Sequence, residues 1–301
     1  MRLLPNILMI GPPGVGKTML AKRIPSILPP LNKEERLEVM KIHSVAGILP
    51  EDCILKERPF RAPHHTITPA ALIGGGKRPK PGEISLAHRG VLFLDEFPEF
   101  HRNVLDLLRQ PLEDEEVRIS RVDGNFTFPS QFMLIAAMNP CPCGYFGSET
   151  HKCRCTPQQI QSYLSRVSGP LLDRMDMQIE LLPVKKEIYL SETPVSESSD
   201  NMKKEVLRVR KIQAERYQDE SIYYNSQLSS DLIRKYCHLN SDSRKILNRA
   251  LARWNLSGRS YYKIIKVAQT ISDFDESQEI EGIHIAEAIR YHCIEKYYGK
   301  E

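Results

Sequence analysis

The chain has 301 residues, of which 41% are hydrophobic and 27% charged, and its formal net charge is +4. These values are ordinary for a globular protein with a large core, and two domains are the natural expectation at this length. The sequence contains no apolar run of the roughly 18 residues that a membrane-spanning helix needs, and its seven cysteines, an odd number, argue against a secreted disulfide scaffold. A reducing, cytoplasmic location fits this cysteine usage better.

Short apolar runs alternate with helical patterns over residues 1–190, which is typical of an α/β fold with a mostly parallel sheet. Such runs suit strands that are covered on both faces. Strands are therefore expected within residues 6–11, 90–96, 132–139 and 177–182. Helices are expected near residues 17–28, 101–112 and 156–166.

The chain changes character after residue 190. Residues 191–200, SETPVSESSD, are polar and lack periodicity, which indicates a linker. Apolar residues at three- and four-residue spacing predict that residues 201–301 are helical throughout. The sequence thus predicts an α/β core over residues 1–190 and a smaller helical domain over residues 201–301.

The first apolar run leads into GPPGVGKT, Gly11 to Thr18, which satisfies the phosphate-loop pattern G-x-x-x-x-G-K-[ST]. In such a loop the glycines let backbone N–H groups converge on phosphate oxygens at a helix N-terminus. Lys17 would reach the β- and γ-phosphates of ATP, and Thr18 would bind Mg²⁺. The predicted nucleotide-binding residues are Gly11, Pro12, Pro13, Gly14, Val15, Gly16, Lys17, Thr18 and Met19.

Polar side chains follow two of the other expected strands. The run GVLFLDE ends in Asp95 and Glu96, and LIAAMNP contains Asn139 at the end of its apolar part. We assign Asp95 to the Mg²⁺ shell and Glu96 to orienting or deprotonating the attacking water, which the amide of Asn139 would help to position. A phosphate loop, an acidic strand end and a strand ending in asparagine, in this order, resemble the AAA+ ATPases.

Four of the seven cysteines, Cys141, Cys143, Cys153 and Cys155, lie within residues 141–155. The C-x-C…C-x-C spacing departs from the C-x₂-C pairs of zinc ribbons, but both thiolates of each pair can still meet one tetrahedral ion. Four thiolates would close the coordination shell, which predicts a structural Zn²⁺ that performs no chemistry. The alternatives are His151 in place of one cysteine, an Fe–S cluster, or a loop of reduced thiols without metal.

Longer motifs sharpen the resemblance. RAPHHTITPAALIGGG, KPGEISLAHRGVLFLDEFPEF, NPCPCGYFG and SGPLLDRMD resemble the magnesium-chelatase-like AAA+ ATPases, specifically the ComM/YifB group, from Leu3 to about Ile294. The resemblance implies a C-terminal helical lid domain, ATP and Mg²⁺ as ligands, and a homo-oligomeric ring, usually a hexamer, with ATP at the subunit interface. The group carries a separate domain ahead of the phosphate loop, whereas Gly11 follows closely on Met1 here, so a fragment or a shortened chain is expected.

Two arginines receive roles only through this resemblance. LLDRMD resembles the segment with an arginine finger, so Arg174 is the candidate to reach the γ-phosphate of a neighbouring subunit; a salt bridge to an adjacent aspartate is the alternative. LSGRSYYKII resembles the start of the sensor-2 helix, so Arg259 is the candidate there, the alternative being one more charge in a basic stretch. His64 and His65 could bind metal or sense nucleotide, although capping and packing are commoner roles for such a pair.

Two segments have the composition of hairpins. Residues 74–90 begin with three consecutive glycines, contain two prolines and cannot form a plain helix, and residues 116–132 have strand-like halves around Asp123-Gly124. In the resembling family the first position holds a hairpin that points into the ring, and the second holds the pre-sensor hairpin. Their basic residues, Lys77, Arg78, Lys80, Arg118 and Arg121, suit a polyanion backbone, and interface packing is the alternative.

The stretch from Arg234 to Lys266 carries nine Lys/Arg against one acid, Asp242, which indicates either a solvated face or a phosphate-contacting surface. Three functions are consistent with the whole sequence. The ComM resemblance implies a DNA motor, acting in branch migration or as a helicase on single-stranded or branched DNA. A chelatase-like remodeller of a partner protein and an ATP-dependent assembly switch are the alternatives.

Overall fold

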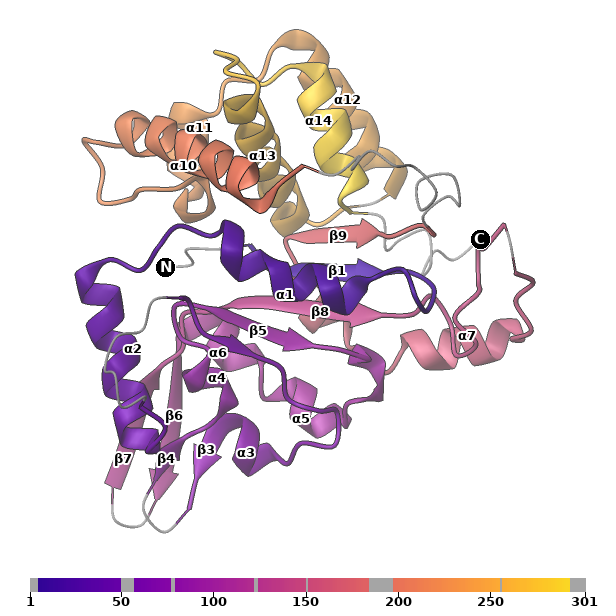
Figure 1. The fold of residues 1–301 in the computed structure, drawn as a ribbon. Helices are drawn as coiled ribbons and strands as arrows, with labels where there is room; N and C mark the ends of the chain where they lie inside the picture. The colour runs from indigo at the N-terminus through magenta and orange to yellow at the C-terminus, as the bar shows by residue number, and fades with distance from the viewer. Residues whose placement is uncertain are drawn as a thin grey trace.

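The structure, a computed structural model, describes residues 5–49, 57–76, 79–121, 124–149, 151–183, 197–254 and 256–292. Its centre is a parallel sheet of five strands in the order β2 (Phe60–Arg61), β5 (Val91–Leu94), β8 (Met133–Met138), β1 (Ile7–Ile10) and β9 (Met177–Glu180) (Figure 1). The four longer strands lie where the sequence predicted them. Because all five strands run in one direction, the loops that follow them meet at one edge of the sheet.

Alternate residues of β1, β5 and β8 belong to two separate apolar cores. Leu8 and Ile10 of β1 face one core, and Met9 faces the other. Every residue of β5 and β8 is buried, which explains why these strands are continuous apolar runs in the sequence.

Helices cover both faces of this sheet. The core around Met9 is closed by Ala21 of α1 (Lys17–Ile27). The opposite core is closed by α3 (Pro69–Ile73), α4 (Glu83–Leu86), the 3₁₀ turn η1 (Phe97–Glu99), α5 (Arg102–Asp106), α6 (Arg109–Asp114), α7 (Pro157–Leu164) and α8 (Gly169–Leu172). Helix α2 (Lys33–Ala46) packs against α4 and begins with a capping box between Asn32 and Glu35.

One predicted helix is not continuous. Residues 101–112 form two short helices, because α5 ends at Asp106 and α6 begins at Arg109. Pro111 has no N–H to donate to the carbonyl of Leu107, and its ring clashes with that carbonyl, so the helix is interrupted there. The expected helices near 17–28 and 156–166 correspond to α1 and α7.

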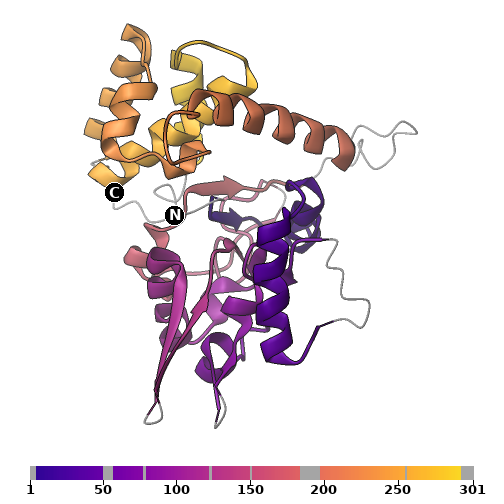
Figure 2. The same cartoon turned by 90° about the vertical axis from the view of Figure 1, so that its left-hand side faces the viewer.

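Both predicted hairpins form. β3 (Gly74–Gly75) pairs antiparallel with β4 (Lys80–Pro81), and β6 (Glu116–Arg121) pairs antiparallel with β7 (Gly124–Pro129). Figures 1 and 2 show the two hairpins projecting from the same end of the core, away from the C-terminal helices. Lys77, Arg78 and Asp123 lie outside the described residues.

The C-terminal helices form their own core, called here the helical region (residues 197–292). It contains α10 (Ser199–Arg216), η2 (Asn225–Gln227), α11 (Ser230–Tyr236), α12 (Ser241–Trp254), α13 (Gly258–Phe274) and α14 (Gly282–Arg290). Helix α10 packs against α1 and begins at Ser199, inside the predicted linker; residues 191–196 and 293–301 lie outside the described residues. The division into two domains stays a prediction. All helices in the described part of the chain are too short or too polar to traverse a lipid bilayer.

Candidate nucleotide-binding site

The phosphate loop turns sharply from β1 into α1. Gly14 and Gly16 have φ angles of 83° and 85°, a left-handed conformation that glycine adopts without strain. Gly11 lies so close to β9 that a Cβ there would be 2.5 Å from the carbonyl oxygen of Leu181. Since α1 begins at Lys17, the free N–H groups of its first turn adjoin the loop and favour an anion.

Lys17 holds the loop together from within. Its Nζ donates to the carbonyl oxygens of Gly11 at 2.7 Å and Pro12 at 2.9 Å, and to Oδ1 of Asn139 at 3.0 Å. Burial lowers the pKa of Lys17 from its usual value, while the Asp95 carboxylate opposes that shift. Because its hydrogen-bond acceptors are neutral, the ammonium offers its charge to a phosphate, and its bond to Asn139 places that amide beside it.

Thr18 and Asp95 meet at the same edge of the sheet. Thr18 Oγ1 donates to Asp95 Oδ2 at 2.6 Å, and this bond joins the first turn of α1 to the end of β5. The backbone N–H of Glu96 donates to the other oxygen, Asp95 Oδ1, at 2.9 Å. Hydroxyl and carboxylate oxygens are ligands that Mg²⁺ accepts, so Thr18 and Asp95 could hold this ion as the sequence predicted.

Glu96 is held by a histidine that the sequence left without a definite role. His65 Nδ1 lies 3.0 Å from Glu96 Oε2, and the His65 ring contacts the rings of His64 and Phe100. The backbone of Glu96 has φ 52°, a left-handed conformation that costs a residue with a side chain about 1 kcal/mol or more. Thr68, rather than either histidine, caps α3. His65 therefore restrains the side chain that we assign to water activation.

The other loop residues differ in exposure. Gly11 is buried, Pro12 and Val15 are half-buried, and Met19 is 62% exposed. A shallow hollow beside the loop is lined by Thr18, Met19, Lys22 and Arg23. The two basic residues were not predicted as part of the site, although their positions one turn after Thr18 on a helix could have indicated them.

Arg174 and Arg259 lie together, but away from the phosphate loop of their own chain. Arg174 forms an ion pair with Glu113 of α6, and Arg259 lies 3.9 Å from the same carboxylate. The Arg174 carbonyl accepts a hydrogen bond of 2.9 Å from Asn6, which precedes β1, whereas the loop follows β1. Because β1 rises about 13 Å over its four residues, the Arg174 backbone beside Asn6 lies at the opposite end of this strand from the phosphate loop.

The helical region holds the Arg174 segment in place. Lys263, one turn after Arg259 on α13, donates to the carbonyl oxygens of Asp173 at 2.5 Å and Met175 at 2.8 Å. Glu113 and Lys263 were not predicted. The four-residue spacing from Arg259 could have indicated Lys263, but a single sequence contains no signal for Glu113, because its partners are distant along the chain.

The four cysteines of residues 141–155 converge on one point. The Sγ distances are 3.4 Å for Cys141–Cys143, 3.7 Å for Cys141–Cys153 and 3.6 Å for Cys143–Cys153, and all four Sγ atoms lie within 4.8 Å of one another. A tetrahedral ion with bonds of about 2.3 Å to sulfur would place its ligands about 3.8 Å apart. The cluster could therefore bind one metal ion, whereas a cluster of several irons would need the thiolates further apart.

The surroundings of the cysteines connect them to the phosphate loop. The backbone N–H of Arg154 is the main cause that lowers the pKa of Cys143 to about 6, which favours a thiolate. His151 stacks on Tyr145 and does not belong to the cluster. Gly144, with φ 85°, touches the loop so closely that a Cβ there would be 2.6 Å from Cδ of Pro13.

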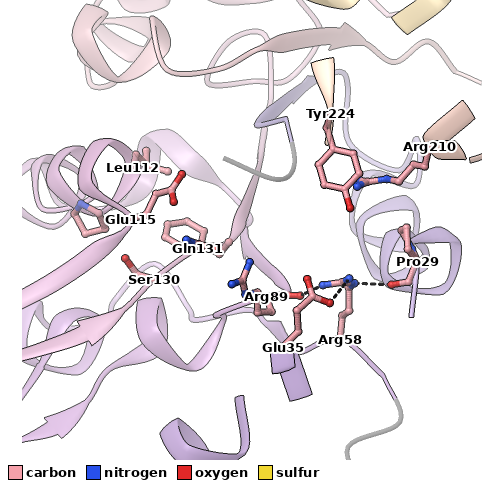
Figure 3. A pocket seen from close by; sticks show the side chains of 12 residues that line it. Pro29, Glu35, Arg58, Arg89, Leu112, Glu115, Ser130, Gln131, Arg210 and Tyr224 are labelled. Carbon is pink, nitrogen blue, oxygen red and sulfur yellow. Dashed lines mark hydrogen bonds and ion pairs between the residues drawn. The ribbon is translucent and has the colours of Figure 1, made fainter. Parts of the chain in front are cut away.

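A second hollow, shown in Figure 3, lies between the core and the helical region. No residue predicted for the nucleotide site lines it. Arg58 donates to the carbonyl oxygens of Pro29 and Arg89 at 2.7 Å each and pairs with Glu35 at 3.1 Å. Arg210 of α10 lies over the ring of Tyr224, 3.9 Å from its centroid. These contacts satisfy the arginines internally, so we interpret the hollow as part of the packing between the two parts of the chain.

The phosphate loop after β1 and the acidic pair after β5, on this parallel sheet, define the class as a P-loop ATPase of the AAA+ fold. The chain belongs to the magnesium chelatase family: the family model described as magnesium chelatase, subunit ChlI, matches residues 4–189, and the model of the ChlI C-terminal part matches residues 196–292.

Similarity to curated proteins supports the same family. The chain is 46% identical over 296 residues to the competence protein ComM of Haemophilus influenzae, and 44% identical over 292 residues to the uncharacterized protein YifB of Escherichia coli K12. An uncharacterized protein of Mycobacterium bovis is 41% identical over 270 residues. These alignments cover 98%, 97% and 89% of this chain but 57%, 56% and 53% of the relatives. The chain thus spans little more than half their length.

The contact between His65 and Glu96 leads to a prediction. We expect His65→Ala to lower kcat for ATP about tenfold or more with little change in KM, because a misplaced base slows proton transfer while nucleotide binding is untouched. His65→Gln, which keeps a hydrogen-bond donor, should recover part of the activity. Steady-state kinetics of both variants would check this, and an unchanged kcat with a raised KM would contradict the positioning role.

Proposed function

We propose that this chain is the motor part of an Mg²⁺-dependent, ATP-hydrolysing homo-oligomeric ring, a hexamer by family resemblance, that acts on DNA. The observation that supports hydrolysis most is the meeting of Lys17, Thr18, Asp95 and Asn139 at one edge of a parallel sheet. These side chains are the polar groups that phosphoryl transfer from ATP to water needs.

Each residue at this edge has a role in the proposal. Lys17 and the loop amides bind the β- and γ-phosphates, and Thr18 and Asp95 hold Mg²⁺, which supplies charge neutralisation for the phosphates. Glu96, restrained by His65, takes the proton of the attacking water, and Asn139 orients this water. Lys17 already donates to Asn139, so the amide is positioned beside the phosphate-binding ammonium.

The arrangement of the arginines supports a shared site. Arg174 and Arg259 both adjoin Glu113, on the edge of the sheet opposite the phosphate loop. We therefore assign both to the γ-phosphate bound by a neighbouring chain, where two guanidinium groups would stabilise the charge of the transition state. In a closed ring every chain would supply the loop of one site and the arginines of the next.

The hairpins and one relative's name support action on DNA. Both hairpins project from one end of the core (Figures 1 and 2), and Lys80 of the first is exposed. Arg118 of the second hairpin is also exposed, although it pairs with Glu116. One of the relatives is a competence protein. A chelatase-like remodeller of a partner protein is the alternative that the family name supports.

We expect Glu96→Gln to reduce ATP hydrolysis by about 100-fold or more while ATP binding remains, because an amide cannot accept the proton of water. Lys17→Ala is the matched control that should lose binding as well. Phosphate release would be measured with and without single-stranded, duplex and four-way-junction DNA. Stimulation by DNA that vanishes in Glu96→Gln supports a DNA motor, whereas hydrolysis indifferent to every DNA would favour the remodeller.

The shared site predicts complementation between inactive chains. Arg174→Ala alone should lower hydrolysis by about 1000-fold. A mixture of Arg174→Ala with Lys17→Ala should recover part of the activity, since an intact loop can meet an intact arginine in a mixed ring. Mixing Lys17→Ala with Glu96→Gln, which damage the same half of the site, is the control without recovery. Equal activity in both mixtures would contradict the assignment of Arg174 to a neighbour.

We further propose that the four cysteines bind one structural Zn²⁺. The Sγ distances of 3.4–3.7 Å match a tetrahedral shell, and four thiolates leave no position open for substrate. Because Gly144 of this loop touches Pro13, the ion would support the phosphate loop as well as its own segment.

This proposal predicts one zinc per chain by elemental analysis. Removal by a strong chelator should lower Tm by several degrees and weaken ATP binding, because the energy of metal binding contributes to folding. Replacement of all four cysteines by serine should have the same two effects. A four-serine variant that folds and hydrolyses ATP normally would show that the metal site is wrong.

A further inference from the structure

The basic stretch of Arg234 to Lys266 separates into two kinds of residue in the structure. Six of the nine side chains are engaged within the chain. Arg234 and Lys235 pair with Asp231 and Glu220, Arg259 adjoins Glu113, and Arg244, Lys263 and Lys266 donate to backbone carbonyl oxygens. The other three, Lys245, Arg249 and Arg253, all belong to α12 and are exposed.

These three residues form a row, called here the basic stripe: Lys245, Arg249 and Arg253. They are spaced four residues apart and therefore lie one above the other on a single face of α12, while Leu247 and Ala250 on another face are buried in the helical region. None of the three forms an ion pair with an acidic side chain among the residues that the structure describes.

The stripe works against the stability of its own helix. Like charges four residues apart repel each other, so Arg249 is repelled by both Lys245 and Arg253. Asp242 is the one acid in the first turn. A solvated helix face gains nothing from three aligned cations without acids between them, whereas an anionic partner would turn the repulsion into attraction.

An exposed aromatic ring adjoins the last cation of the stripe. Trp254, the last residue of α12, is 42% exposed, and the Arg253 guanidinium lies 5.7 Å from its ring centroid. It is the single tryptophan of the chain. Cations beside an exposed aromatic ring are the combination that binds nucleic acid, because phosphates pair with the charges while bases stack on the ring.

We propose that the basic stripe and Trp254 form a DNA-binding surface on the helical region, distinct from the hairpins. The stripe is about 12 Å long at a rise of about 1.5 Å per residue, and one strand of a duplex presents a phosphate about every 3.4 Å along the axis, so the three charges are close enough together to meet phosphates of one strand. Helix α12 lies in the helical region, whereas the hairpins project from the opposite end of the core (Figures 1 and 2). The inference rests on the proposed action on DNA and adds a second DNA-binding surface to it.

Tryptophan fluorescence tests the surface directly, because emission comes from Trp254 alone. Titration of the whole chain with oligothymidine should quench this emission, and added salt should reverse the quenching in parallel with the decrease in DNA binding measured by anisotropy. DNA that binds by anisotropy without changing the Trp254 emission would overturn the proposal.

A charge-matched pair of variants tests the stripe. In Lys245→Gln/Arg249→Gln/Arg253→Gln, the slope of log K against log salt for duplex DNA should fall by about 2.7, because each phosphate that a cation neutralises adds about 0.9 to the slope. The control Lys33→Gln/Lys204→Gln/Lys211→Gln removes the same charge from exposed sites on α2 and α10 and should keep the slope. The stripe variant should not unfold at a lower temperature than the original chain, since repulsion within α12 is relieved.

The outcomes separate this surface from the proposed function. If the original chain binds no DNA under low salt, the action on DNA and this surface both fail. If it binds DNA and the two triple variants have equal slopes, the surface alone is wrong. If the slopes are equal and the original chain binds polyglutamate but the stripe variant does not, the stripe binds an acidic protein and the proposal is overturned.

Discussion

The common direction of the five strands is the constraint on which the candidate site depends. Each strand ends at the same edge of the sheet, so Lys17, Asp95 and Asn139, distant in sequence, come within reach of one another. The same direction places Asn6 and the Arg174 segment at the other edge. A phosphate loop and an arginine pair on opposite edges are the arrangement that the proposed head-to-tail ring requires.

The helical region contacts both the helix that follows the phosphate loop and the segment that carries Arg174. Helix α10 packs against α1, which follows the phosphate loop, and α13 holds the Arg174 segment through Lys263. A shift of the helical region would therefore move the loop helix and the arginine segment together. The Glu113 carboxylate, which pairs with Arg174 and adjoins Arg259, provides an anionic partner for both guanidinium groups within a single chain.

Local signals were sufficient where one segment sets its own conformation. The loop from Gly11 to Thr18 could be predicted because its glycines adopt left-handed angles, and the strands β5 and β8 because each is buried along its whole length. The single helix expected near 101–112 is wrong, because Pro111 interrupts the backbone hydrogen bonds at Leu107 and divides the segment into α5 and α6. The role of His65 could not be predicted, because its contact with Glu96 joins two loops that approach only in the folded sheet.

The sequence by itself determined the family, the parallel α/β core, the phosphate loop and the candidate ligands for nucleotide, Mg²⁺ and a metal at the cysteines, because these depend on residue types at short, regular spacings. Only the tertiary structure decided which groups meet. It paired Arg174 with Glu113, placed Arg259 beside them, and left the basic stripe of α12 without acidic partners in the described part of the chain, while the lysines of α13 were used internally. The physical reason is that an ion pair depends on distance in space, which the spacing of residues along the chain does not contain.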